Sequence, residues 1–125
     1  MAKRILVVDD ERDVLQVIQK MLEGHGYDVT PSVSGAEALA LLSSQRFDLV
    51  FLDVMMPEMD GLEVCRQIRQ TEGLADLPVV FLTAKGGGEA LGEVLEAGGT
   101  LYISKPFTGE KLRAILQALL DGASA

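Results

Sequence analysis

Three aspartates directly follow runs of apolar residues, and this placement constrains the fold more than any other feature of the chain. Asp9 and Asp10 come after Ile5–Val8, and Asp53 comes after Leu49–Leu52. If the two runs are neighbouring parallel strands, their carboxyl ends place all three carboxylates in one crevice, where open α/β sheets bind ligands. Carboxylate oxygens are the ligands that Mg²⁺ prefers, and Mg²⁺ keeps positions open for water and phosphate. The pattern therefore indicates a magnesium site suited to phosphoryl chemistry.

Short apolar runs alternate with segments of helical periodicity, a pattern typical of βαβ units around a parallel sheet. The near-continuous apolar character of the strands predicts a sheet covered on both faces, and hence a three-layer α/β/α sandwich. Ser34 with Glu37, and Asp60 with Glu63, predict where two of the helices begin. We expect strands near Arg4–Val8, Tyr27–Thr30, Asp48–Leu52, Pro78–Leu82 and Leu101–Ile103.

Length and composition predict one domain over residues 1–125, with 121–125 as a tail or the start of a linker, because 125 residues with 48% hydrophobic content can bury a single core. The formal charge of −8 argues against direct nucleic acid binding, since duplex affinity depends on basic residues that meet phosphates. The single Cys65 excludes an internal disulfide and suits a reducing compartment. No apolar run approaches the roughly 18 residues of a membrane span. We therefore expect a cytoplasmic protein.

Two further residues belong at the edge that carries the aspartates. Thr83 closes the fourth apolar run, and Lys105 follows the fifth. A hydroxyl and an ammonium near a carboxylate cluster can hydrogen-bond and neutralise phosphoryl oxygens. Each of these residues also has a plainer interpretation, and Asp10 in particular could be only the N-terminal cap of the first helix.

Five segments together resemble the receiver domain of two-component response regulators, which has a CheY-like fold. The resemblance covers essentially the whole chain, and it implies a five-stranded parallel sheet in the flavodoxin-like order 2-1-3-4-5. The segments are Val7-Val8-Asp9-Asp10, the strand that ends at Asp53, Met55-Met56-Pro57-Glu58-Met59-Asp60-Gly61, Thr83-Ala84 and Lys105-Pro106-Phe107.

The resemblance implies how the acidic residues divide the work. Asp53 would accept the phosphoryl group. Asp9 and Asp10 would bind Mg²⁺ together with Asp53, and the backbone carbonyl of Met55 would be a further ligand. The only chemistry of the domain would then be phosphoryl uptake and autodephosphorylation at its own Asp53, so we do not expect an enzyme that acts on external substrates.

The resemblance also assigns roles to the other residues of the crevice. Thr83 would move to hydrogen-bond the phosphoryl group, and Lys105 would pair with it. Tyr102 would be an aromatic switch that changes exposure when Thr83 moves. The peptide bond between Lys105 and Pro106 would be cis.

A signalling role follows from the same resemblance. The phosphoryl group would come from the phosphohistidine of a sensor histidine kinase or a histidine phosphotransfer protein. The output surface, about Gly88–Leu120, would contact a downstream protein or a tethered effector domain, or would form a phosphorylation-dependent dimer. Both a stand-alone regulator and the front end of a longer chain fit the sequence. Gly86-Gly87-Gly88, with Gly92 one turn further on, predicts a poorly formed start of the fourth helix.

Other classes share parts of the pattern. An aspartate-nucleophile phosphatase of the haloacid dehalogenase type also uses an acid after strand one, then a threonine and a lysine. It would need an aspartate two residues after the nucleophile, and Glu11 stands there after Asp9. A flavodoxin-like electron carrier should have a Ser/Thr-rich phosphate loop where this chain has acids. A dinucleotide-binding fold lacks support because no glycine fingerprint follows a strand.

Overall fold

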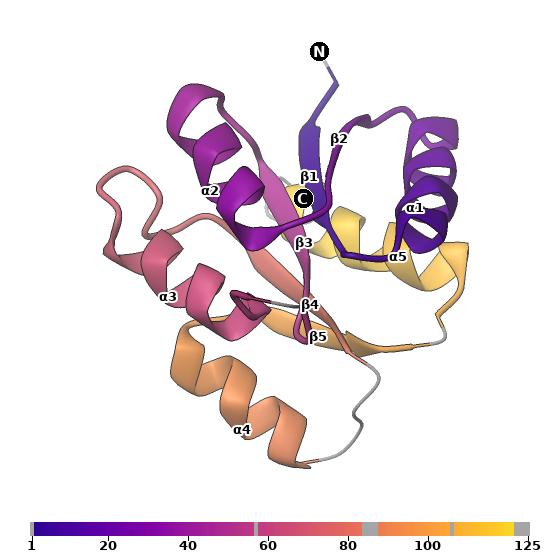
Figure 1. The fold of residues 1–125 in the computed structure, drawn as a ribbon. Helices are drawn as coiled ribbons and strands as arrows, with labels where there is room; N and C mark the ends of the chain where they lie inside the picture. The colour runs from indigo at the N-terminus through magenta and orange to yellow at the C-terminus, as the bar shows by residue number, and fades with distance from the viewer. Residues whose placement is uncertain (1, 57, 84–87, 106, 122–125) are drawn as a thin grey trace.

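The computed structural model describes residues 2–56, 58–83, 88–105 and 107–121. Within these residues, five parallel strands form one sheet in the order β2-β1-β3-β4-β5, which confirms the expected topology (Figure 1). The strands are β1 (Arg4–Val8), β2 (Asp28–Ser32), β3 (Leu49–Asp53), β4 (Val79–Thr83) and β5 (Leu101–Ser104).

Helices cover both faces of the sheet and give the three-layer sandwich that the apolar strands predict (Figure 1). One face packs against α1 (Arg12–Gly24) and α5 (Gly109–Leu116), and a π-helical turn (Gln117–Asp121) continues α5. The other face packs against α2 (Gly35–Ser44), α3 (Gly61–Gln70) and α4 (Gly88–Ala97). The described helices are all too short or too polar to cross a membrane.

The strands build two hydrophobic cores because successive side chains point to opposite faces of a sheet. On β1, Leu6 and Val8 join the core under α2, α3 and α4, whereas Ile5 and Val7 join the core under α1 and α5. Cys65 of α3 lies in the first of these cores, and burial raises the pKa of its thiol. The cysteine is therefore a core residue with a poorly reactive thiol.

Local hydrogen bonds explain where the helices begin. Ser34 Oγ accepts a hydrogen bond from the Glu37 amide at 3.1 Å, and Asp60 Oδ1 accepts one from the Glu63 amide at 2.9 Å, as the sequence predicts. The alternative interpretation of Asp10 as the cap of α1 is wrong, because Glu11 is the residue at that position and its side chain makes no capping hydrogen bond.

The boundaries of β2 differ from the expected Tyr27–Thr30. The strand runs on through Pro31 and Ser32, which pair with Val7 and Val8 of β1. Proline cannot donate a ladder hydrogen bond, but β2 lies at the edge of the sheet, where proline is tolerated. The expected weak start of the fourth helix and the cis bond before Pro106 concern residues 84–87 and 106, which lie outside the described residues.

Gly61 brings the start of α3 against the end of β3. Its amide donates a hydrogen bond to the Val54 carbonyl at 2.9 Å, and a Cβ added to it would overlap the carbonyl oxygen of Asp53. Only glycine allows this approach, which sets the position of the chain around Asp53.

We predict that Gly61→Ala lowers the free energy of unfolding by about 2–3 kcal/mol, because the new methyl group forces the backbone of β3 and α3 apart. Gly92 on α4 is the matched control, since a Cβ there meets nothing within 4 Å. Gly92→Ala should instead raise stability by roughly 0.5–1 kcal/mol. Urea denaturation measures both, and equal stability of Gly61→Ala and the unaltered protein would contradict the close approach.

Candidate functional site

Because the strands are parallel, the predicted site residues meet at the carboxyl ends of the strands. Asp53 is the last residue of β3 and pairs with Leu82, one residue before Thr83 at the end of β4. Asp9 directly follows β1, and Lys105 directly follows β5. The Lys105 amide also donates a hydrogen bond to the Thr83 carbonyl at 2.7 Å, which ties the last two strand ends together.

Lys105 lies between two buried carboxylates. Its Nζ is 3.0 Å from Asp9 Oδ2 and 3.6 Å from Asp53 Oδ1. The side chain of Asp9 is fully buried, and its Oδ1 accepts a hydrogen bond from the Glu11 amide at 3.0 Å. The side chain of Asp53 keeps 8% of its surface exposed. The lysine therefore holds Asp9 in place and supplies positive charge to an aspartate that solvent can still reach.

The third carboxylate completes a set of oxygens suited to a divalent cation. One carboxylate oxygen from each of Asp9, Asp10 and Asp53 lies within 4.8 Å of the others. Asp10 is exposed, so its side chain forms the solvent-facing side of the cluster. Hard oxygen donors of this kind fit Mg²⁺, which binds through one or two carboxylates and keeps water or phosphate in its other positions. The role of the Met55 carbonyl as a further ligand stays a prediction.

Burial and charge shift the pKa of both central groups. Burial raises the pKa of Asp53 to about 6, and the charge of Asp9 adds to the effect, while Lys105 and a backbone hydrogen bond from Met55 oppose it. Burial by itself would lower the pKa of Lys105, but the hydrogen bond to Asp9 and the charges of Asp53 and Asp9 outweigh burial and raise it. Lys105 therefore stays protonated at neutral pH.

Thr83 and Tyr102 lie where the resemblance implies, although their movement stays a prediction. Thr83 is buried at the end of β4, next to β3 and its terminal Asp53. Tyr102 pairs with Phe81 in the sheet and is half-buried against the core under α2, α3 and α4. A side chain in this position can change its exposure if that core or α4 shifts.

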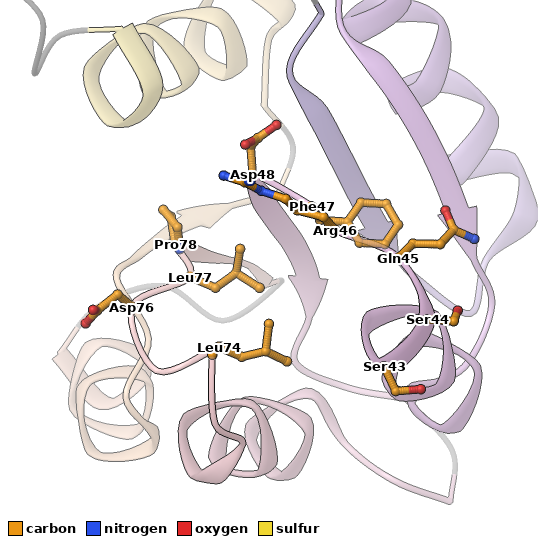
Figure 2. A pocket seen from close by; sticks show the side chains of 11 residues that line it. Ser43, Ser44, Gln45, Arg46, Phe47, Asp48, Leu74, Asp76, Leu77 and Pro78 are labelled. Carbon is orange, nitrogen blue, oxygen red and sulfur yellow. The ribbon is translucent and has the colours of Figure 1, made fainter.

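A hollow at the amino ends of the strands, opposite the crevice, is lined by neither the three-aspartate cluster nor Lys105. It lies between the end of α2 and the loop before β4, with Leu74 and Leu77 on one side and Ser43 and Ser44 on the other (Figure 2). Its Asp48 carboxylate already accepts a hydrogen bond from the Arg4 amide at 2.8 Å and so supports the fold.

One contributor to the site carries no signal in the sequence. The Glu11 amide orients Asp9, but any residue other than proline offers this hydrogen bond. Gly61 belongs to one of the segments that resemble the receiver family, but its close contact with the Asp53 carbonyl appears only in the structure.

Comparison with known proteins agrees with the geometry. The response regulator receiver domain family matches residues 5–117 of the chain. The response regulator MprA of Mycolicibacterium vanbaalenii is 48% identical over 120 residues, which are 96% of this chain and 51% of that protein. MprA of Mycobacterium tuberculosis is 47% identical over the same length. The chain thus spans about half the length of these relatives.

Solved structures show the same fold. The chemotaxis protein CheY4 of Vibrio cholerae has a TM-score of 0.92 and 33% identity over 96% of this chain and 100% of that chain. The receiver domain of the sensor histidine kinase PA1611 from Pseudomonas aeruginosa has a TM-score of 0.88 and 34% identity over 95% of this chain and 98% of its own, and it has a magnesium ion in the active site cleft.

The fold and the acidic crevice thus define a CheY-like domain of two-component signalling. The chain belongs to the response regulator receiver domain family.

We predict that Asp53→Asn raises the melting temperature in the absence of Mg²⁺. Two like charges ~4 Å apart repel by about 4 kcal/mol at an effective dielectric near 20, before relaxation and the opposing charge of Lys105. The exposed Asp76, at the other edge of the sheet, is the control. Asp76→Asn should leave the melting temperature nearly unchanged, and the same small effect of Asp53→Asn would contradict the strained cluster.

Mg²⁺ should raise the melting temperature of the unaltered protein more than that of Asp10→Asn, because the variant lacks one carboxylate of the shared site. Calorimetric scans with and without Mg²⁺ measure the two shifts, and Asp76→Asn should respond like the unaltered protein. Equal shifts for Asp10→Asn and the unaltered protein would show that the three carboxylates do not share a cation.

The raised pKa of Asp53 also predicts a pH dependence. Below about pH 6 the folded protein binds a proton at Asp53 that the unfolded chain, with a pKa of 3.8, does not yet bind. The contribution of Asp53 to stability therefore improves as pH falls from 7 towards 4, by on the order of 3 kcal/mol at most. Without Mg²⁺, the stability advantage of Asp53→Asn should shrink between about pH 7 and about pH 5. An advantage that does not change with pH would contradict the shifted pKa.

Proposed function

We propose that Asp53 accepts a phosphoryl group from the phosphohistidine of a sensor histidine kinase or a histidine phosphotransfer protein. One observation carries the proposal, namely the Lys105 ammonium 3.0 Å from Asp9 and 3.6 Å from Asp53 at the edge where three carboxylates meet. The Asp53 nucleophile, the positive charge of Lys105 and the cation site then lie around the position of the transferred phosphoryl group. The domain therefore acts as a phosphorylation-activated switch.

The residues of the crevice divide the work of phosphoryl transfer. A carboxylate oxygen of Asp53 forms the bond to phosphorus while the bond from phosphorus to the histidine nitrogen breaks, and the electron pair leaves with the imidazole. Such transfer depends mainly on positioning and on the stabilisation of charge. Lys105 neutralises a phosphoryl oxygen, and Thr83 donates a hydrogen bond to another. Mg²⁺, held by Asp9, Asp10, Asp53 and the Met55 carbonyl, supplies further positive charge when bound.

The burial of Asp9 favours this assignment over a haloacid dehalogenase-type phosphatase. In such a phosphatase the acid after strand one, here Asp9, would be the nucleophile. The side chain of Asp9 is fully buried, and its two oxygens accept hydrogen bonds from Lys105 and from the Glu11 amide. A carboxylate in this state is a poor nucleophile, whereas Asp53 keeps an exposed surface.

The acyl phosphate on Asp53 turns the output on, and the lifetime of that phosphate determines how long the output lasts. Water that reaches the same phosphorus resets the switch, so the domain turns over only its own phosphate.

The segment about Gly88–Leu120 offers exposed Leu95 and Leu101 as contacts for a downstream protein, a tethered effector domain or a second receiver. The mycobacterial relatives extend to about twice the matched length. A cytoplasmic location is part of the proposal.

We predict that acetyl phosphate with Mg²⁺ adds one hydroxylamine-sensitive phosphate per chain and that Asp53→Asn abolishes the addition. Asp76→Asn, which removes an exposed carboxylate far from the crevice, should leave it unchanged. Intact-protein mass spectrometry measures the stoichiometry. Full labelling of Asp53→Asn would show that another group is the acceptor.

A further inference from the structure

Arg69, in the last turn of α3, fastens the carboxyl end of α4 to the rest of the fold. Its Nε donates a hydrogen bond to the Gly98 carbonyl at 2.7 Å, directly after α4 ends. Its Nη1 donates one to the Leu77 carbonyl at 2.7 Å, just before β4. Its Nη2 lies 3.5 Å from Thr100 Oγ1, just before β5. One planar cation thus joins four elements through donors in a fixed fork.

A glycine turn and backbone hydrogen bonds also hold the chain in place around this contact. Gly98 has φ +93, a left-handed conformation that ends α4, and a Cβ there would lie 2.8 Å from Arg69 Cγ. The amides of Gly98 and Gly99 donate to the last turn of α4, and the Thr100 amide donates to the Val79 carbonyl at 2.9 Å. The end of α4 and the start of β5 therefore form one rigid joint around Arg69.

Two residues of α4 close to this joint pack into the core. Within residues 92–97, whose side chains are described, Val94 and Ala97 are buried, whereas a Cβ on Gly92 would meet nothing within 4 Å. The amino end of α4, at Gly88, lies on the side of Thr83, the residue expected to move. Thr83 is therefore connected along the chain to the end of α4 that lies opposite Arg69.

We propose that Arg69 makes the carboxyl end of α4 a fixed pivot, so that phosphorylation moves the amino end of the helix and leaves residues 98–100 in place. The proposal rests on the phosphoryl-accepting role of Asp53. A helix held at one end turns a small displacement at the other end into a rotation, because packed elements move as rigid bodies. The rotation reorients the exposed Leu95 without breaking the joint to β5.

Hydrogen exchange at single amides, read by NMR with and without acetyl phosphate and Mg²⁺, tests the pivot in the unaltered protein. The amides of Gly98, Gly99 and Thr100 should be strongly protected and should not change on phosphorylation. Amides in the first turns of α4, from Gly88 to Gly92, should change in the same samples. An equal change over both segments would overturn the pivot.

Substitution of the arginine gives the second arm. Arg69→Gln should speed exchange at Gly98, Gly99 and Thr100 by roughly tenfold or more in the resting state, since hydrogen bonds from a charged donor are lost. The same amides should then respond to phosphorylation. Arg66→Gln is the matched control, because Arg66 lies on the same helix, is exposed and pairs with Glu63 at 3.6 Å. It should behave like the unaltered protein.

The outcomes separate this role from the proposed function. Unchanged exchange at residues 98–100 in Arg69→Gln would overturn the pivot while the phosphate on Asp53 stands. Absence of phosphate from the unaltered protein would overturn the proposed function, and the pivot with it. If Arg69→Gln does not fold, the comparison of the two ends of α4 in the unaltered protein still decides the question.

Discussion

The contact of Lys105 with two carboxylates at the carboxyl ends of the strands determines the chemistry of the site. Asp9 and Asp53 would repel each other in a buried crevice, and the ammonium 3.0 Å from one and 3.6 Å from the other offsets part of that repulsion. Burial, together with the remaining excess of negative charge, keeps the pKa of Asp53 high, and the negative charge makes the site attractive to a divalent cation. The same imbalance that costs stability at rest thus prepares the site for Mg²⁺ and a phosphoryl group.

A parallel sheet is what makes such a cluster possible. Every strand ends at the same edge, so single residues at the ends of β1, β3, β4 and β5 meet although they are far apart in sequence. The amino ends of the strands and the helices can then transmit the conformational change that phosphorylation causes. Arg69, which binds the loops that enter β4 and β5, belongs to this second part of the molecule.

The sequence predicted those features that depend on periodicity and on local hydrogen bonds. The strand order followed from the family resemblance, and the caps at Ser34 and Asp60 followed from the spacing of the acids after them. The extension of β2 through Pro31 was missed because edge position is a tertiary property. The roles of the Glu11 amide and of Arg69 were also invisible, since each depends on backbone groups that only the fold brings within reach.

A crystal structure with Mg²⁺ and beryllofluoride, a stable mimic of the phosphoryl group, tests whether Asp53 is the phosphoryl acceptor. We expect one beryllium bonded to a carboxylate oxygen of Asp53, with Lys105 and Thr83 in contact with its fluorides and the cation bound by Asp9 and Asp10. A beryllofluoride group on another residue, or a cation that none of the three aspartates binds, would contradict the proposed role of Asp53.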